Sequence, residues 1–187
     1  MNLTEVNIRP HLVPFLFKEF EGKEASYMET KSKSVKIYPF SSIGKYLYTQ
    51  LKNHIKIGKK DQYVLYMMIE KNKNISYSGK LYISINSIYE LLKVPEENEK
   101  NINNFFEDIF RISFIYWIEG CLEHNKQYNL VSAIDAFIDK YELLEAGFSN
   151  ETLRRLYYRE KTKDTRLSRL QNQSATRVLN FKSVSHK

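Results

Sequence analysis

The chain has 187 residues, 42% hydrophobic and 14% aromatic, which is enough for one domain with a real core and excludes wholesale disorder. Its single cysteine, Cys121, excludes a disulfide framework and a cysteine-based metal site. The formal net charge is +7, and no stretch is apolar enough for a signal peptide or a membrane span, so we expect a cytoplasmic protein outside the membrane.

The N-terminal third gives few local signals. Residues 1–34 have poor periodicity, and residues 35–38 form a short β-like run that stops at Pro39. Apolar residues then follow at helical spacing behind a serine that can cap a helix, which predicts a helix over residues 42–53.

The middle of the chain contains a short, continuous apolar run at residues 63–69 that is compatible with helix or strand. We favour helix, because Asp61 can cap it and its two methionines suit a helix. Residues 81–85 alternate in polarity and predict a short strand. A capped helix is expected over residues 86–93.

The strongest helical signal covers residues 98–117. The apolar positions that repeat at helical spacing, with one serine among them, are Ile102, Phe105, Phe106, Ile109, Phe110, Ser113, Phe114 and Trp117. Glu107, Asp108 and Arg111 fall on the opposite face, which we expect to face solvent. Residues 112–118 are apolar all round, so this part is either buried helix or a strand.

Two further helices are predicted near the C-terminus. Residues 131–141 form an amphipathic helix, and Gly147 ends the turn that follows it. Ser149 can cap the next helix, whose apolar stripe consists of Leu153, Leu156 and Tyr157. That helix either continues through residues 167–170 or frays after about residue 162.

These elements predict an α+β protein that is mainly helical with a minor β component. We expect residues 1–147 to form a neutral globular body and residues 148–167 to form a basic helix packed on it. Residues 168–187 are rich in Asn, Gln, Ser and Arg, which is typical of a flexible basic tail.

The order of elements predicted for residues 61–120 resembles a winged-helix arrangement and is similar in outline to domains of plasmid replication initiators. The resemblance implies a helix-turn-helix within residues 86–110 and a wing at residues 113–130. The acids on the outer face of the long helix would repel phosphate, however. We therefore expect this region to form core or a homodimer surface, with the ridge of Phe105, Phe106 and Phe110 as its candidate interface.

Charge is distributed very unevenly along the chain. Residues 151–187 contain ten basic and three acidic residues, whereas residues 1–150 contain 19 of each and are neutral overall. Six of the eight arginines lie in the C-terminal part. A neutral body with an arginine-rich end favours a polyanionic partner, and nucleic acid is the most common one. The alternative is a solvated basic terminus without a partner.

The second C-terminal helix has the character of a recognition helix, with apolar residues that dock it and basic residues on its outer side. The candidate nucleic-acid-binding residues are Arg154, Arg155, Tyr158, Arg159, Lys161, Lys163, Arg166 and Arg169. Their chemistry suits phosphate and guanine contacts, so we favour duplex DNA as the partner. The expected function is that of a regulator or an accessory factor of a bacterial mobile element.

Two other functions stay open. The many tyrosines would suit an RNA-binding or ribosome-associated protein, and the basic tail would suit a protein-interaction module that docks on an acidic partner. No catalytic constellation, metal-ligand spacing or phosphate-cradling loop is present in the sequence. We therefore expect neither an enzyme nor a bound metal or cofactor.

Overall fold

The computed structural model describes residues 3–27, 30–38, 40–51, 63–71, 77–85, 94–124, 129–161 and 167–171. Its elements, with η for 3₁₀ helices, follow in the order β1 (Leu3–Ile8), α1 (Leu12–Glu19), β2 (Lys23–Tyr27), β3 (Thr30–Ile37), α2 (Ser42–Gln50), β4 (Tyr63–Lys71), β5 (Tyr77–Ile85), α3 (Glu96–His124), α4 (Leu130–Tyr141), η1 (Leu143–Ala146), α5 (Asn150–Lys161) and η2 (Leu167–Gln171). The fold is α+β, with more residues in helices than in strands among those described, as the sequence predicted.

The five strands form one antiparallel sheet in the order β1-β5-β4-β3-β2. Opposite each other in the register lie Val6 of β1, Leu81 of β5 and Met67 of β4, and all three side chains are fully buried. This row forms part of the sheet face that packs against α1, in line with the alternation of apolar and polar residues along β5.

The predicted helix at residues 63–69 is wrong, because this segment lies within strand β4. Strand β4 pairs with β3 on one side and β5 on the other, so both of its edges are hydrogen-bonded. A short, continuously apolar run is typical of an interior strand as well as of a helix, and pairing with segments far along the chain decides between them. The predicted strand at residues 81–85 is confirmed and begins earlier, at Tyr77.

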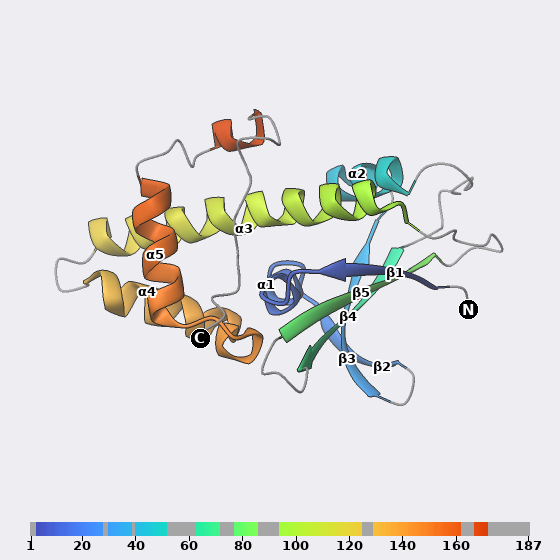
Figure 1. Cartoon of the computed structure of the whole chain (residues 1–187), viewed down its shortest axis with the longest axis horizontal. Helices are drawn as coiled ribbons and strands as arrows, with labels where there is room; N and C mark the ends of the chain where they lie inside the picture. The colour runs from blue at the N-terminus through green and yellow to red at the C-terminus, as the bar shows by residue number, and fades with distance from the viewer. Residues whose placement is uncertain are drawn as a thin grey trace, which may run out of the picture.

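Helix α1 was not predicted, although it fills the centre of the molecule. It contacts the sheet on one side and α3 and α4 on the other (Figure 1). Pro14 is its third residue, where the amide would have no partner within the helix, so proline is tolerated there. Leu12, Phe15 and Leu16 are fully buried, which makes α1 the layer between sheet and helices.

Helix α2 confirms the prediction for residues 42–53, with an earlier end at Gln50. The amide of Gly44 donates a hydrogen bond of 3.0 Å to the Ser41 hydroxyl oxygen, which caps the helix. On the inner face of α2, Leu47 is fully buried, and Tyr46 stacks on Phe105 of α3 with ring centroids 4.0 Å apart. These contacts fasten α2 to the first half of α3.

Helix α3 has 29 residues and is therefore about 43 Å long at 1.5 Å per residue. In Figure 1 it runs along the molecule, with the sheet and α2 at one end and α4 and α5 at the other. Residues 112–118 are helix, which resolves the alternative that the sequence left open. Ile112, Phe114, Ile115 and Ile118 are buried between neighbouring elements, which explains the loss of amphipathic pattern there.

The winged-helix arrangement is not observed in the described residues. Residues 63–69 form a strand where that arrangement placed a helix, and residues 113–124 continue α3 where it placed the wing. The helix predicted over residues 86–93 lies outside the described residues.

Helices α4 and α5 follow the predicted pattern. Asn129 caps α4 by accepting a hydrogen bond of 2.9 Å from the Ser132 amide, and Tyr141 ends the helix. Gly147 then adopts a positive φ of 79°, which glycine accommodates without a steric penalty. Its Cα lies so near the Tyr77 ring that an added Cβ would come within 2.7 Å of Tyr77 Cδ2.

One core contains side chains from every described element except β2 and η2. Phe106 and Phe110 are fully buried in it, and Phe105 is half-buried against Tyr46. The aromatic ridge of α3 is therefore not an exposed dimer surface, contrary to one sequence expectation. No helix among the described residues is long and apolar enough to cross a membrane.

Candidate nucleic-acid interface

Helix α5 is positioned by its first turn and its apolar stripe. The Thr152 amide donates a hydrogen bond of 3.3 Å to the Ser149 hydroxyl, as the predicted cap requires. Leu153, Leu156 and Tyr157 are buried, which confirms the predicted stripe. In Figure 1, α5 crosses α4 and the C-terminal part of α3, and it contacts both helices.

The opposite face of α5 is exposed and mostly basic. Arg154, Arg155, Tyr158, Arg159 and Lys161 are all exposed, as expected. The Arg155 side chain is 75% exposed and its Nε lies 2.8 Å from Glu151 Oε1 one turn earlier. The Arg154 guanidinium lies 5.9 Å from the Tyr158 ring centre, so both groups can meet a ligand together.

This face has the chemistry of a polyanion contact. A guanidinium group can form two hydrogen bonds to phosphate oxygens, or to the edge of guanine in the major groove. A tyrosine can donate a hydrogen bond to phosphate or stack on an unpaired base. The one acidic side chain on the face, Glu151, stands at the N-terminal end of α5, where it also complements the helix dipole.

The remaining candidates divide into two groups. Lys163 and Arg166 lie outside the described residues. Arg169 does not belong to an exposed tail: residues 167–171 form η2, and the Arg169 side chain is only 8% exposed. Its expected exposure is wrong, because two carboxylates on other helices bind it in the interior.

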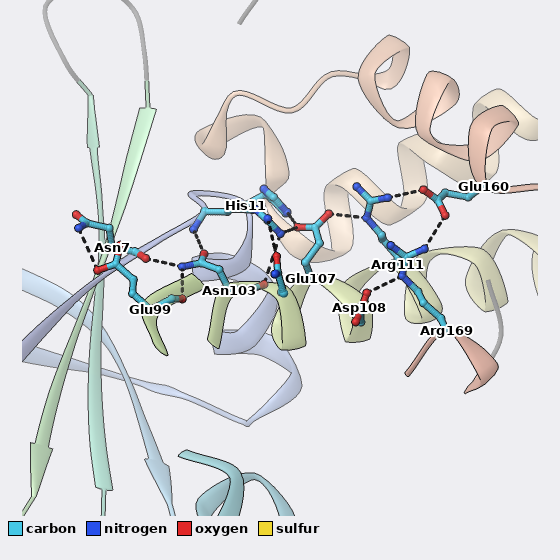
Figure 2. A network of polar contacts seen from close by, with 11 residues as sticks. Asn7, His11, Glu99, Asn103, Glu107, Asp108, Arg111, Glu160 and Arg169 are labelled. Carbon is cyan, nitrogen blue, oxygen red and sulfur yellow. Dashed lines mark hydrogen bonds and ion pairs between the residues drawn. The ribbon is translucent and has the colours of Figure 1, made fainter. Parts of the chain in front are cut away.

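Arg169 belongs to a buried ion cluster that joins α3, α5 and η2 (Figure 2). Its Nε donates to Asp108 Oδ1 over 2.7 Å, and its Nη1 donates to Glu160 Oε2 over 2.8 Å. Glu160 also accepts a hydrogen bond from Arg111, whose side chain is fully buried. Arg111 in turn donates from Nε to Glu107 Oε1 over 2.6 Å.

The same cluster reaches the turn between β1 and α1. Glu107 Oε2 lies 2.8 Å from His11 Nε2 and 3.1 Å from Arg9 Nη1. The amide of Arg9 donates to Asn103 Oδ1 over 2.9 Å, and Asn103 lies one turn before Glu107 on α3. A polar stripe on α3 therefore contacts both the start of α1 and the end of α5 (Figure 2).

Burial and charge act in opposite directions on this cluster. Burial alone would raise the pKa of Glu107, but the interactions with His11, Arg111 and Arg9 outweigh it and hold that pKa far below its usual value. Burial lowers the pKa of Arg111, while Glu107 and Glu160 oppose that shift. The carboxylate of Glu107 is thus ionised throughout the ordinary pH range.

Sequence reasoning missed this cluster because it placed Glu107, Asp108 and Arg111 on a solvent face. All three are buried: 2%, 1% and 0% exposed, respectively. The signal that could have revealed them is the repeat of polar residues every four positions at Glu99, Asn103, Glu107 and Arg111 within a largely apolar helix.

No group of three or more His, Cys, Asp or Glu side chains in the described part of the chain could hold a metal ion. Cys121 is half-buried on α3. The chain has no significant match to any family model, curated protein or solved structure, so its function is inferred from its own residues.

Proposed function

We propose that this protein binds nucleic acid, and duplex DNA in preference, through the exposed face of α5. The observation that carries the proposal is the combination of a helix fixed in the core on one side with three arginines, a lysine and a tyrosine on the other. A rigid helix can present these groups together, which lowers the entropy lost on binding.

The charge of this face sets the expected strength and character of binding. Four basic side chains and Glu151 give the face a net charge of +3. If all four bases neutralise phosphates, the logarithm of the affinity should fall with the logarithm of salt concentration with a slope of about −3.6. Such a surface would attract the phosphate backbone of any sequence, and individual arginines could in addition read base edges.

Binding without a chemical step would suit a regulator or an accessory factor of a bacterial mobile element, so the proposal includes neither catalysis nor a cofactor. A second candidate, single-stranded RNA binding, is favoured by one observation: Tyr158 is 53% exposed beside Arg154 and could stack on an unpaired base.

Binding of the full chain to a random 20-base-pair duplex over a range of salt concentrations tests the proposal. We expect Arg154→Gln with Arg155→Gln to weaken binding and to reduce the salt slope by about 1.8, since each lost phosphate contact removes about 0.9. Lys45→Gln serves as the matched control, because Lys45 is an exposed base on α2, at the other end of α3.

Absence of binding by the wild-type chain at low salt would overturn the proposal. Equal binding by the double variant would exclude α5 as the contact. Preferential competition by single-stranded RNA would instead favour the second candidate, and binding to acidic protein alone would favour an interaction module.

A further inference from the structure

The two ends of α5 are attached to the body in different ways. At the N-terminal end, the Asn150 side-chain amide donates to Asp135 Oδ1 of α4 over 2.7 Å, and Leu153 enters the core. At the C-terminal end, where Arg159 and Lys161 project, Glu160 is only 1% exposed and its carboxylate enters the ion cluster. The orientation of the basic end of α5 therefore depends on how Glu160 is bound.

Arg169 binds Glu160 and α3 at once. Its guanidinium uses separate nitrogens for Asp108 on α3 and Glu160 on α5, at 2.7 and 2.8 Å. A planar guanidinium can serve two carboxylates in fixed directions, which an ammonium group cannot do with the same geometry. One side chain from η2 thus links α3 and α5, in addition to the direct hydrogen bond from Arg111 of α3 to Glu160 of α5.

Each buried carboxylate of the cluster is contacted by at least one guanidinium group. Arg111 and Arg169 contact Glu160, Arg169 contacts Asp108, and Arg9 and Arg111 contact Glu107. His11 also lies beside Glu107, and Arg159 at the surface of α5 lies 3.8 Å from Glu160 Oε1. The Arg169 guanidinium is thus held by two carboxylates in the interior, which separates it from Arg154 and Arg155 on the exposed face of α5.

We propose that Arg169 is a positioning residue: by bridging Asp108 and Glu160 it holds the basic end of α5 on α3 and so keeps the α5 surface competent to bind. The inference rests on the proposed function for the identity of the ligand, but the attachment of α5 is a property of the free protein. Arg169 itself makes no contact with nucleic acid.

A positioning residue and a contact residue affect binding differently. Loss of positioning reduces the fraction of molecules that can bind, so the affinity falls by the same factor at every salt concentration. Loss of a phosphate contact lowers the salt slope itself, by about 0.9. The salt dependence of binding therefore distinguishes the two roles.

The test uses the full chain, the random 20-base-pair duplex and two variants. Arg169→Gln removes the bridge, and Asp108→Asn with Arg169→Gln also removes the buried charge that loses its Arg169 partner, which protects the fold. We expect both to lower affinity by about 5-fold to 150-fold, the usual range of coupling between sites, with an unchanged salt slope. Arg155→Gln, as the contact control, should lower the slope.

Hydrogen exchange of the free proteins supplies the second readout. We expect faster exchange of α5 amides in both variants, with α1 amides unchanged, because the cluster fastens α5 locally. A lower salt slope for Arg169→Gln, or α5 exchange equal to wild type, would overturn the inference. If the wild-type chain fails to bind DNA, the proposed function fails, and the exchange experiment still decides whether Arg169 holds α5.

Discussion

At the scale of the residue, two arginines of one segment have opposite environments. Arg155 has a side chain that is 75% exposed, and its partner, Glu151, is exposed as well. Arg169, 14 residues later, is 8% exposed between two carboxylates that are almost fully buried. Surface ion pairs contribute little to stability, whereas removing one member of a buried pair leaves an uncompensated charge. Arg155 is therefore available for the proposed ligand contact, whereas Arg169 has a structural role.

Gly147 is a second residue whose role follows from its immediate surroundings. Its φ of 79° is strained for any residue with a Cβ, and the nearby Tyr77 ring leaves no room for one. We expect Gly147→Ala to reduce the free energy of unfolding by at least about 1–3 kcal/mol, measured by urea denaturation. Gly120→Ala is the matched control: it lies within α3 with no atom near its Cβ position, and it should stabilise by about 0.5–1 kcal/mol. Equal effects of the two changes would contradict this explanation.

At the scale of the element, α3 combines a hydrophobic core helix with a buried polar stripe. Its apolar side chains pack against α1, α2 and α4, while Glu107, Asp108 and Arg111 connect it to the β1–α1 turn, to η2 and to α5, respectively. A long helix that contacts most other elements is well suited to fix their relative orientation. Each buried charge on α3 needs an oppositely charged partner. These charges should therefore restrict which elements can pack against the helix.

The lowered pKa of Glu107 makes α3 sensitive to acid. Because folding favours the ionised carboxylate, its stabilisation is complete above the unfolded value of about 4.5 and is lost as pH falls below it. We expect the free energy of unfolding in urea to decrease as pH falls from about 4.5 toward the much lower pKa of Glu107 in the folded protein. In Glu107→Gln, stability should start about 3–5 kcal/mol lower and change less over this interval. The same pH dependence in both proteins would contradict the role of Glu107.

The predictability of α5 and α3 differs for a physical reason. The cap at Ser149 and the stripe of Leu153, Leu156 and Tyr157 are local, so the sequence predicted the position of α5 and its exposed basic face. On α3 the sequence located the helix but reversed the environment of Asp108, whose partner is 61 residues away. Helical periodicity reports which residues share a face, and it does not report what covers a polar face.

At the scale of the whole molecule, α5 is part of the body rather than an addition to it. Leu153, Leu156 and Tyr157 belong to the same core as the sheet, and Glu160 forms an ion pair with Arg111 of α3. The exposed charge that is available to a partner therefore sits on a surface that the entire fold supports. A change that weakens the core should also weaken ligand binding.

Truncation tests the dependence of the body on α5. Ending the chain at Gly147 removes four buried hydrophobic side chains worth about 1.5–3 kcal/mol each and leaves Arg111 without Glu160. That loss is comparable to the total stability of a typical domain, about 5–15 kcal/mol, so we expect residues 1–147 not to fold. Residues 1–171, which retain every contact described above, should keep the near-UV circular dichroism and thermal transition of the full chain. A cooperative thermal transition in residues 1–147 would contradict the dependence.

The sequence by itself determined the α+β class, the helices α2, α4 and α5, and the division between a neutral body and a basic C-terminal part. These features depend on composition, caps and periodicity, which act over a few residues. Only the tertiary structure decided that β4 is a strand, that the charges of α3 are buried, and that Arg169 belongs to the interior. Each of these depends on a partner elsewhere in the chain, and burial sets whether a charge meets water, a ligand or another charge.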